Sequence, residues 1–315
     1  HASHMPESTD KARDLVRMAV ARSINLLPLH QQRAGVTCLA LIIGGGISGM
    51  VAAREIAAQG FEAVLVEREK ELGGNLRQIY FLSHKDPQDF LKTLKQKVEN
   101  DPRITIYKGA NVNNISGFLG NYVSEITTEI GSVVTVKNGV VIIATGGVEY
   151  KPVEYLYGQS SQILTQLELE TELYKKHLDF QKIKSVAMIQ CVGSREPDHQ
   201  YCSRVCCSHA VNNAIRLKEA NPEMDVYVLY RDMRTYGMSE IKYRKARELG
   251  VTFIRFEVAH KPEVALENGS LRIKVLDTNL NRELTLSSDL LVLSTAIRPQ
   301  PDAADFANLL KLSLT

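Results

Sequence analysis

Long apolar runs, signal-peptide features and an excess of either charge are all missing from this sequence. The longest apolar stretch, residues 38–53, is interrupted by four glycines and is shorter than the roughly 20 residues that cross a bilayer, so we expect no membrane span. Lys and Arg number 38 against 36 Asp and Glu, a net charge of +2 without a basic block, which disfavours a nucleic-acid-binding protein. Hydrophobic residues make up 44% and charged residues 23%, so a disordered or collagen-like chain is excluded.

Length and cysteine usage narrow the class of protein further. At roughly 150 residues per domain, 315 residues predict two domains, each large enough to bury its own core. Residues 1–5 resemble a cloning remnant, so we expect the native protein to start at Met5 or just after it. Without a signal-peptide pattern we expect a cytoplasmic protein, in which clustered cysteines favour metal or redox chemistry over disulfides.

The hydrophobic pattern predicts an amphipathic helix followed by two α/β units. Residues 10–27 carry apolar side chains at helical spacing up to Pro28, and we expect this helix to dock onto the domain that follows. From Val36 onward the pattern alternates buried strands with helices, as in a parallel sheet, while residues 120–139 predict an antiparallel meander. The strand and helix pattern restarts near Lys184.

We therefore predict an α/β fold of two Rossmann-like, dinucleotide-binding-type domains, the second inserted into the first. The strand DLLVLSTAIRP near the chain end repeats the pattern of VVIIATGG in the first unit, which indicates a pseudo-repeat. The predicted parts are a helical extension (6–35), the first part of the first domain (36–180), the inserted domain (181–296) and the return to the first domain (297–315). A closing strand is missing before Thr315, so we expect either a fragment or an absent tail.

A glycine-rich turn after the first predicted strand predicts a dinucleotide site. The run from Gly44 to Gly49 matches G-x-G-x-x-G between a strand and a helix. In this motif Gly44 makes the tight turn, Gly46 admits a pyrophosphate at the helix N-terminus, and Gly49 lets the helix pack closely. Glu67 lies 18 residues beyond Gly49 at the end of the second strand, where a carboxylate binds ribose hydroxyls.

These residues alone do not distinguish FAD from NAD. A second glycine pair, Gly73 and Gly74, provides a flexible segment that can wrap the remainder of a long cofactor, which favours FAD. The second unit has only Gly193 where its own phosphate loop would stand. Binding of NAD(P) there, with Arg231 and Asp232 at the ribose position, is therefore the weaker interpretation.

Four of the five cysteines lie in the segment that replaces the second phosphate loop. Cys191 ends a predicted strand, and Cys202, Cys206 and Cys207 surround the start of the next helix, giving the spacing C-x10-C-x3-C-C. Four thiolates suit an iron-sulfur cluster or zinc, although the adjacent pair is unusual for structural zinc. Inert or regulatory thiols are the third interpretation, and a C-x-x-C redox pair is absent. Cys38, within the first predicted strand, is expected in the core.

Several segments, in this order, resemble the flavin-binding, thioredoxin-reductase-like core of the A-subunit family of heterodisulfide reductases: KARDLVRMAVAR, LIIGGGISGM, GGNLRQ, VVIIATGG, IQCVGSR, YCSRVCCSHA and YRDMRTYG. The resemblance implies FAD in the first unit and a 4Fe-4S cluster on Cys191, Cys202, Cys206 and Cys207. The positions that match the FAD site of the family are Gly44, Gly46, Ile47, Ser48, Gly49, Glu67, Arg68, Gly73, Gly74, Asn75, Leu76, Val112, Ala144, Thr145 and Gly146.

The chain differs from the large methanogenic members, which carry a further N-terminal cluster domain and C-terminal ferredoxin modules. It resembles the short form of sulfur-oxidising complexes, which implies other heterodisulfide-reductase-like subunits and a lipoate-binding protein as partners. Asn212 stands where many bifurcating relatives carry a lysine near the flavin. Because a neutral amide supplies no positive charge, this position argues against electron bifurcation.

The expected activity is therefore that of an oxidoreductase subunit. It passes electrons between FAD and an adjacent 4Fe-4S cluster within a cytoplasmic heterodisulfide-reductase-like complex of sulfur-compound oxidation. Two alternatives remain open: a stand-alone NAD(P)H-dependent flavin disulfide oxidoreductase, and a non-catalytic scaffold with structural cofactors. A homodimer is expected because related flavoproteins dimerise. We assign no catalytic role to any residue, His209 included.

Overall fold

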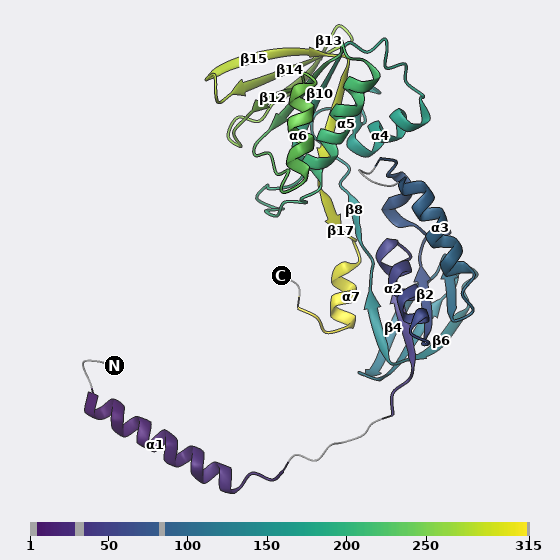
Figure 1. Cartoon of the computed structure of the whole chain (residues 1–315), viewed down its shortest axis with the longest axis vertical. Helices are drawn as coiled ribbons and strands as arrows, with labels where there is room; N and C mark the ends of the chain where they lie inside the picture. Colours follow the sequence, from purple (N-terminus) through teal and green to yellow (C-terminus); the bar gives the residue numbers. More distant parts are fainter. Residues whose placement is uncertain (1–4, 29–34, 82–85, 314–315) are drawn as a thin grey trace. The chain divides into compact units, whose positions relative to one another are not determined.

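The computed structural model describes residues 5–28, 35–81 and 86–313, in two units that comprise residues 1–36 and 37–315 (Figure 1). The first unit contains the helix α1 (Met5–Ile24), which is shifted toward the N-terminus from the expected residues 10–27. It ends where Ser23 donates to the carbonyl of Val20, a contact that competes with further helix growth. Docking of this helix stays a prediction, and residues 1–4 of the expected cloning remnant lie outside the described residues.

The second unit begins with a parallel sheet in the strand order β3-β2-β1-β7. Its strands are β1 (Leu39–Ile43), β2 (Glu62–Glu67), β3 (Ile104–Lys108) and β7 (Val140–Ile143). The helices α2 (Ile47–Ala58) and α3 (Pro87–Glu99) make the crossovers, and Asp86 caps α3 by accepting the N–H of Gln88 at 2.8 Å. β1 lies inside the sheet, which explains its uninterrupted apolar run.

Alternate residues of β1 face two different layers. Ile42 packs with α2 and α3, whereas Leu41 and Ile43 pack with the predicted antiparallel meander, formed by β4 (Asn111–Phe118), β5 (Asn121–Thr127) and β6 (Val133–Asn138). The chain end returns to this second layer, because Phe306 of α7 (Ala303–Leu309) packs against it. Cys38 precedes β1 and is exposed, so the expectation of a core position was wrong: the strand begins one residue later, at Leu39.

A second parallel sheet has the strand order β12-β11-β10-β16-β9. Its strands are β9 (Ile163–Thr165), β10 (Ser185–Val192), β11 (Asp225–Tyr230), β12 (Thr252–Arg255) and β16 (Leu290–Thr295). One face packs against α4 (Gln166–Lys175), α5 (Cys206–Ala220) and α6 (Ser239–Glu248). The other packs against β13 (Glu263–Glu267), β14 (Ser270–Asp277) and β15 (Arg282–Ser288). The edge strand β9 lies upstream of residue 181, where we placed the start of the inserted domain.

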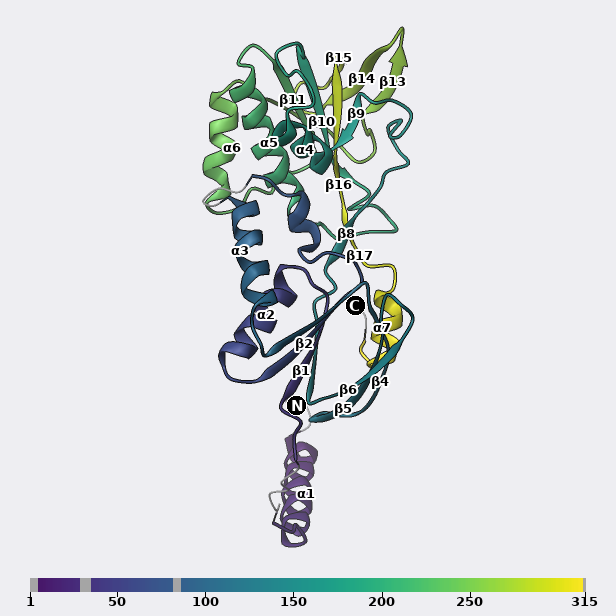
Figure 2. The same cartoon turned by 90° about the vertical axis from the view of Figure 1, so that its right-hand side faces the viewer.

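Two short antiparallel strands connect the sheets. β8 (Gly147–Glu149) leads away from the first sheet and β17 (Ile297–Pro299) leads back, with Gly147 paired to Pro299. They run side by side in both views (Figure 2). The chain thus forms two parallel-sheet units with one inserted in the other. No helix within the described ranges is long and apolar enough to span a bilayer.

Candidate cofactor site and cysteine loop

A cavity of about 340 Å³ lies at the carboxyl ends of β1, β2 and β7. Every predicted FAD position except Gly49 lines it, including Val112 on β4 and the segment from Ala144 to Gly146 after β7. The short helix η1 (Gly74–Gln78) contributes Asn75 and Leu76 to the wall. The carboxyl edge of a parallel sheet is where ligands bind in such folds.

The three glycines of the motif differ in what surrounds them. Gly44 has a φ of +112°, and a Cβ there would lie 2.3 Å from the carbonyl oxygen of Ala144. A Cβ on Gly49 would lie 1.8 Å from the carbonyl oxygen of Gly44, so this glycine lets α2 pack against the turn. A Cβ on Gly46 meets no described atom within 4 Å. Gly46 starts α2 without a side-chain cap among the described residues, so N–H groups of the first turn remain for an anion.

Glu67 is buried at the end of β2 with both carboxylate oxygens engaged. Oε2 accepts the N–H of Gly45 at 2.6 Å, and Oε1 accepts the N–H of Glu69 at 2.8 Å. Each oxygen keeps further acceptor capacity. The contacts therefore fix the carboxylate at the cavity wall, where it can receive ribose hydroxyls.

Sequence reasoning missed three cavity residues from the end of the chain: Gln300, Asp302 and Phe306. The side chain of Gln300 donates to the carbonyl of Thr145 at 3.2 Å, and Arg68 binds both Gln300 and Asp302. Asp302 stands at the N-cap of α7 but makes no capping bond, and its Oδ1 is buried without a hydrogen-bond partner in the described structure. A buried acceptor of this kind requires a donor, and a hydroxyl-bearing ligand such as FAD would supply one. No motif marks these residues, since they reach the cavity only through the fold.

The cysteine loop begins where β10 ends. Cys191 and Cys207 are buried, whereas Cys202 and Cys206 are half-buried. The thiol of Cys206 donates to the carbonyl of Thr295 at 3.4 Å, and that of Cys207 to the carbonyl of Asp232 at 3.8 Å. The backbone N–H of Arg204 donates to Sγ of Cys202 at 3.4 Å.

The four thiols are close enough to influence one another electrostatically. Burial raises the pKa of Cys206 to about 12, and the other three thiols add to the shift. Burial also raises the pKa of Cys191 and of Cys207. The four cysteines lie within one segment, residues 191–207, and their role as ligands of one centre stays a prediction. Among the described residues, however, no three His, Cys, Asp or Glu side chains are grouped so as to hold a single metal ion.

Three of the nine non-glycine residues with positive φ in the described part of the chain lie in the segment 191–207. Cys191 has a φ of +64°, Arg195 of +58° and Arg204 of +64°, values that non-glycine residues seldom adopt. Such strain is common at functional sites. Arg195 pairs with Asp232 at 2.7 Å, and the buried Arg231 pairs with Glu196.

The position of the second phosphate loop is filled by side chains. A Cβ on Gly193 would lie 2.2 Å from the ring of Tyr150, and the guanidinium of Arg298 stacks 3.7 Å from the centroid of that ring. Arg231 and Asp232, expected at the ribose position, take part in the ion pairs of the cysteine loop. In the structure both residues therefore stabilise the segment that carries the cysteines.

The comparisons agree on the fold. Residues 42–90 match a family model described as an NAD(P)-binding Rossmann-like domain. The thioredoxin reductase of Lactococcus lactis matches with a TM-score of 0.58 and 18% identity, over 86% of this chain and 80% of that one. The thioredoxin reductase of T. acidophilum matches with a TM-score of 0.54 and 16% identity, over 84% and 79%. The expected thioredoxin-reductase-like fold class is confirmed.

A curated relative gives the family. The iron-sulfur A-subunit of the CoB--CoM heterodisulfide reductase of Methanocaldococcus jannaschii is 30% identical in an alignment that covers the whole of this chain and 62% of the relative. The chain is a homologue of the A-subunits of heterodisulfide reductases. It spans about three fifths of the length of such relatives. The predicted resemblance to these A-subunits is confirmed, and the relatives are reductases by name.

The positive charge that Asn212 itself lacks is supplied by a neighbouring side chain. Asn212 carries no charge, but its Oδ1 accepts a 2.7 Å hydrogen bond from the ammonium of Lys242 on α6. A cation therefore still stands beside α5 in this homologue. The absence of charge on Asn212 itself does not make the region neutral.

Proposed function

We propose that the chain is an electron-transfer subunit that binds FAD in the cavity and a 4Fe-4S cluster at the cysteine loop. The proposal places it in the cytoplasm, in a heterodisulfide-reductase-like complex of sulfur-compound oxidation. The observation that carries it is the presence of both elements in one fold. The cavity contains a buried carboxylate oxygen of Asp302 without a described partner, and the inserted unit carries four cysteines within residues 191–207.

The donor set favours a cluster over a single zinc ion. Zinc requires its thiolates to converge on one point, whereas the four irons of a cubane each take a different thiolate and therefore accept more widely spaced sulfurs. Four cysteines on β10, in the loop after it and at the start of α5 supply such a set of four thiolates.

When bound, FAD accepts or releases an electron pair and the cluster transfers single electrons. Residues of the chain bind and orient these groups. The N–H groups at the start of α2 receive the pyrophosphate, Glu67 receives ribose hydroxyls, and Asp302 accepts a hydrogen bond from a hydroxyl of the ligand. Cys191, Cys202, Cys206 and Cys207 ligate the cluster, and the loop around them limits access of water.

The partners proposed for the chain are other heterodisulfide-reductase-like subunits and a lipoate-binding protein, with a homodimer as the assembly unit. The names of the relatives, which designate them as subunits, support the first of these. The lipoate-binding protein and the homodimer rest on the resemblance to the short form of the family.

The test is anaerobic purification followed by quantitation of flavin, iron, zinc and acid-labile sulfide. The same quantities are measured on a variant with Cys206→Ser and Cys207→Ser, and on the matched control Cys38→Ser, which removes a thiol outside the loop. We expect flavin in all three proteins, and loss of iron and sulfide only from the double variant. Flavin without iron or sulfide in the parent would favour the stand-alone oxidoreductase. A flavin that no reductant of moderate potential reduces would favour the scaffold.

A titration with NAD(P)H tests the first alternative, the stand-alone flavin disulfide oxidoreductase, directly. A self-contained NAD(P)H oxidoreductase predicts bleaching of the flavin on addition of NADPH or NADH. We expect no bleaching, because Tyr150 and Arg298 fill the space beside Gly193 that a second phosphate loop would use.

A further inference from the structure

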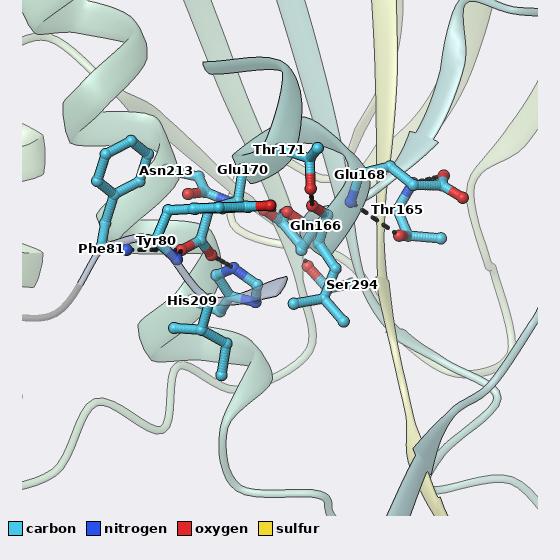
Figure 3. A network of polar contacts seen from close by, with 12 residues as sticks. Tyr80, Phe81, Thr165, Gln166, Glu168, Glu170, Thr171, His209, Asn213 and Ser294 are labelled. Atoms are coloured by element: carbon cyan, nitrogen blue, oxygen red, sulfur yellow. Dashed lines mark hydrogen bonds and ion pairs between the residues drawn. The ribbon is translucent and has the colours of Figure 1, made fainter. Parts of the chain in front are cut away.

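Glu170 of α4 is a buried carboxylate outside the cavity and outside the cysteine loop. It is 1% exposed. Its Oε1 accepts the backbone N–H of Tyr80 at 2.6 Å and of Phe81 at 2.8 Å, and its Oε2 contacts Nε2 of His209 (Figure 3). Burying a carboxylate is costly unless it is hydrogen-bonded, and these three partners meet that requirement.

The partners of Glu170 come from the two candidate sites. Tyr80 and Phe81 continue directly from residues 73–79, which line the cavity. His209 lies on α5, two residues after Cys207. One side chain therefore joins the wall of the cavity to the cysteine-bearing helix.

Aromatic contacts strengthen the same junction. The ring of Tyr80 stacks on Tyr174 of α4 with centroids 4.2 Å apart and planes 15° apart. The guanidinium of Arg216, on α5, lies 4.3 Å from the centroid of the Phe81 ring. The side chain of Tyr80 thus contacts α4, and the side chain of Phe81 contacts α5.

Helix α4 does not need Glu170 for its own stability. Thr165 and Glu168 form a capping box at its N-terminus, and Leu169 buries it against the core. The carboxylate of Glu170 makes its contacts away from its own helix, with residues 80, 81 and 209. The buried position of Glu170 is therefore explained by its contacts with Tyr80, Phe81 and His209.

We propose that Glu170 is a positioning residue, which fixes the cavity wall to the cysteine-bearing helix and so sets the separation of the two redox centres. The inference rests on the proposed function. Because electron-transfer rates fall steeply with separation, a fixed separation keeps the transfer fast. A junction made by a buried carboxylate with two backbone donors is also directional, so it defines orientation as well as distance.

The experiment compares Glu170→Ala and Glu170→Gln with the parent. The amide oxygen of Gln can still accept both backbone N–H groups, whereas Ala removes the acceptor. The matched control is Glu172→Gln on the same helix, where the carboxylate pairs with His177 at 3.5 Å outside this network. Two readouts are used: hydrogen exchange of the Tyr80 and Phe81 amides, and the rate of electron equilibration between flavin and cluster after flash photoreduction.

For E170A we expect amide exchange about tenfold faster or more, because a charge-assisted hydrogen bond is lost. We expect electron equilibration to slow by a factor of about ten, with flavin and iron contents unchanged. E170Q keeps an acceptor for both backbone N–H groups but loses the charge and places an NH₂ group in place of one oxygen, so it should show smaller changes in the same direction. E172Q should behave as the parent. If E170A does not fold, Glu170→Asp, which retracts the carboxylate by one methylene, replaces it.

Two results overturn the inference. One is faster amide exchange in E170A with unchanged electron equilibration, since Glu170 would then hold only the local segment. The other is unchanged exchange of the Tyr80 and Phe81 amides, since their hydrogen bonds to Glu170 would then not stabilise this segment. A parent protein that lacks flavin or cluster counts against the proposed function instead, and the exchange readout still decides whether the junction exists.

Discussion

The ammonium of Lys242 on α6 binds the side-chain oxygen of Asn212 on α5 at 2.7 Å, which places a cation beside the helix that carries two of the four clustered cysteines. Burial lowers the pKa of Lys242 from its ordinary value of 10.5, and the nearby charges of Arg216 and Lys245 lower it further. Above this lowered pKa the folded chain holds fewer protons than the unfolded chain, so stability rises with pH.

The first prediction follows from this rise of stability with pH. As the pH rises from neutral toward 10.5, the free energy of unfolding of the parent should increase relative to that of Lys242→Gln. Urea denaturation at several pH values measures the difference. Lys182→Gln, which removes an exposed ammonium paired with Asp179, is the control. Identical trends for the two variants would contradict the prediction.

The second prediction concerns two glycines of one motif. Gly49→Ala should lower the free energy of unfolding by about 3 kcal/mol or prevent folding, because its Cβ would lie 1.8 Å from a carbonyl oxygen. Gly46→Ala should change stability by less than about 1 kcal/mol, since its Cβ meets no described atom within 4 Å. It should instead lower flavin content by filling space in the cavity. Denaturation curves and flavin-to-protein ratios decide between these outcomes, and equal behaviour of the two variants would refute the assignment.

The third prediction tests the ribose acid. In Glu67→Gln one carboxylate oxygen becomes an NH₂ group that faces a backbone N–H, either of Gly45 or of Glu69. We expect a loss of about 1–3 kcal/mol in stability together with weaker flavin binding. Chemical denaturation of the flavin-free protein separates the first effect from the second. Full flavin affinity in this variant would show that Glu67 is a structural residue only.

The fourth prediction uses the unpartnered oxygen of Asp302. Asp302→Ala should weaken flavin binding by a factor of about ten or more, the value of a hydrogen bond to a charged acceptor. Its stability without flavin should stay within about 1 kcal/mol of the parent, because the Oδ1 atom has no described partner to lose and the 3.5 Å ion pair of Oδ2 with Arg68 is exposed to solvent. Asp305→Ala, at an exposed position on the same helix, is the control, and flavin fluorescence titration is the measurement. Equal affinities would remove Asp302 from the site.

Local patterns predicted most of the fold. The βαβ unit around Gly44 and the antiparallel meander at residues 120–139 followed from hydrophobic periodicity and glycine-rich turns, because these signals act over a few residues. The strand β9 was missed because its three residues, Ile163–Thr165, are too short for a periodic signal and its partner β16 lies more than a hundred residues away. The exposure of Cys38 was missed because hydropathy does not define the first residue of a strand.

The cavity residues likewise divide into those that a sequence motif predicts and those that only the fold brings to the cavity. Gly44, Gly46 and Glu67 were predicted because a motif joins them over a short stretch of chain. Gln300 and Asp302 were not, since only the return of the chain after β17 brings them to Arg68. The junction at Glu170 was likewise invisible, because its backbone donors leave no trace in the types of residue that carry them.

The pairing of Gly147 with Pro299 has a consequence for how the inserted unit is accommodated. The chain leaves the first sheet through β8 and comes back toward it through β17, and these two strands form a ladder of their own, about 5 Å apart. Everything between these two residues is an insertion whose two ends are already held together. The first sheet therefore needs no deformation to accommodate the inserted unit. The length of the inserted unit can vary at little cost in conformational entropy to the first unit.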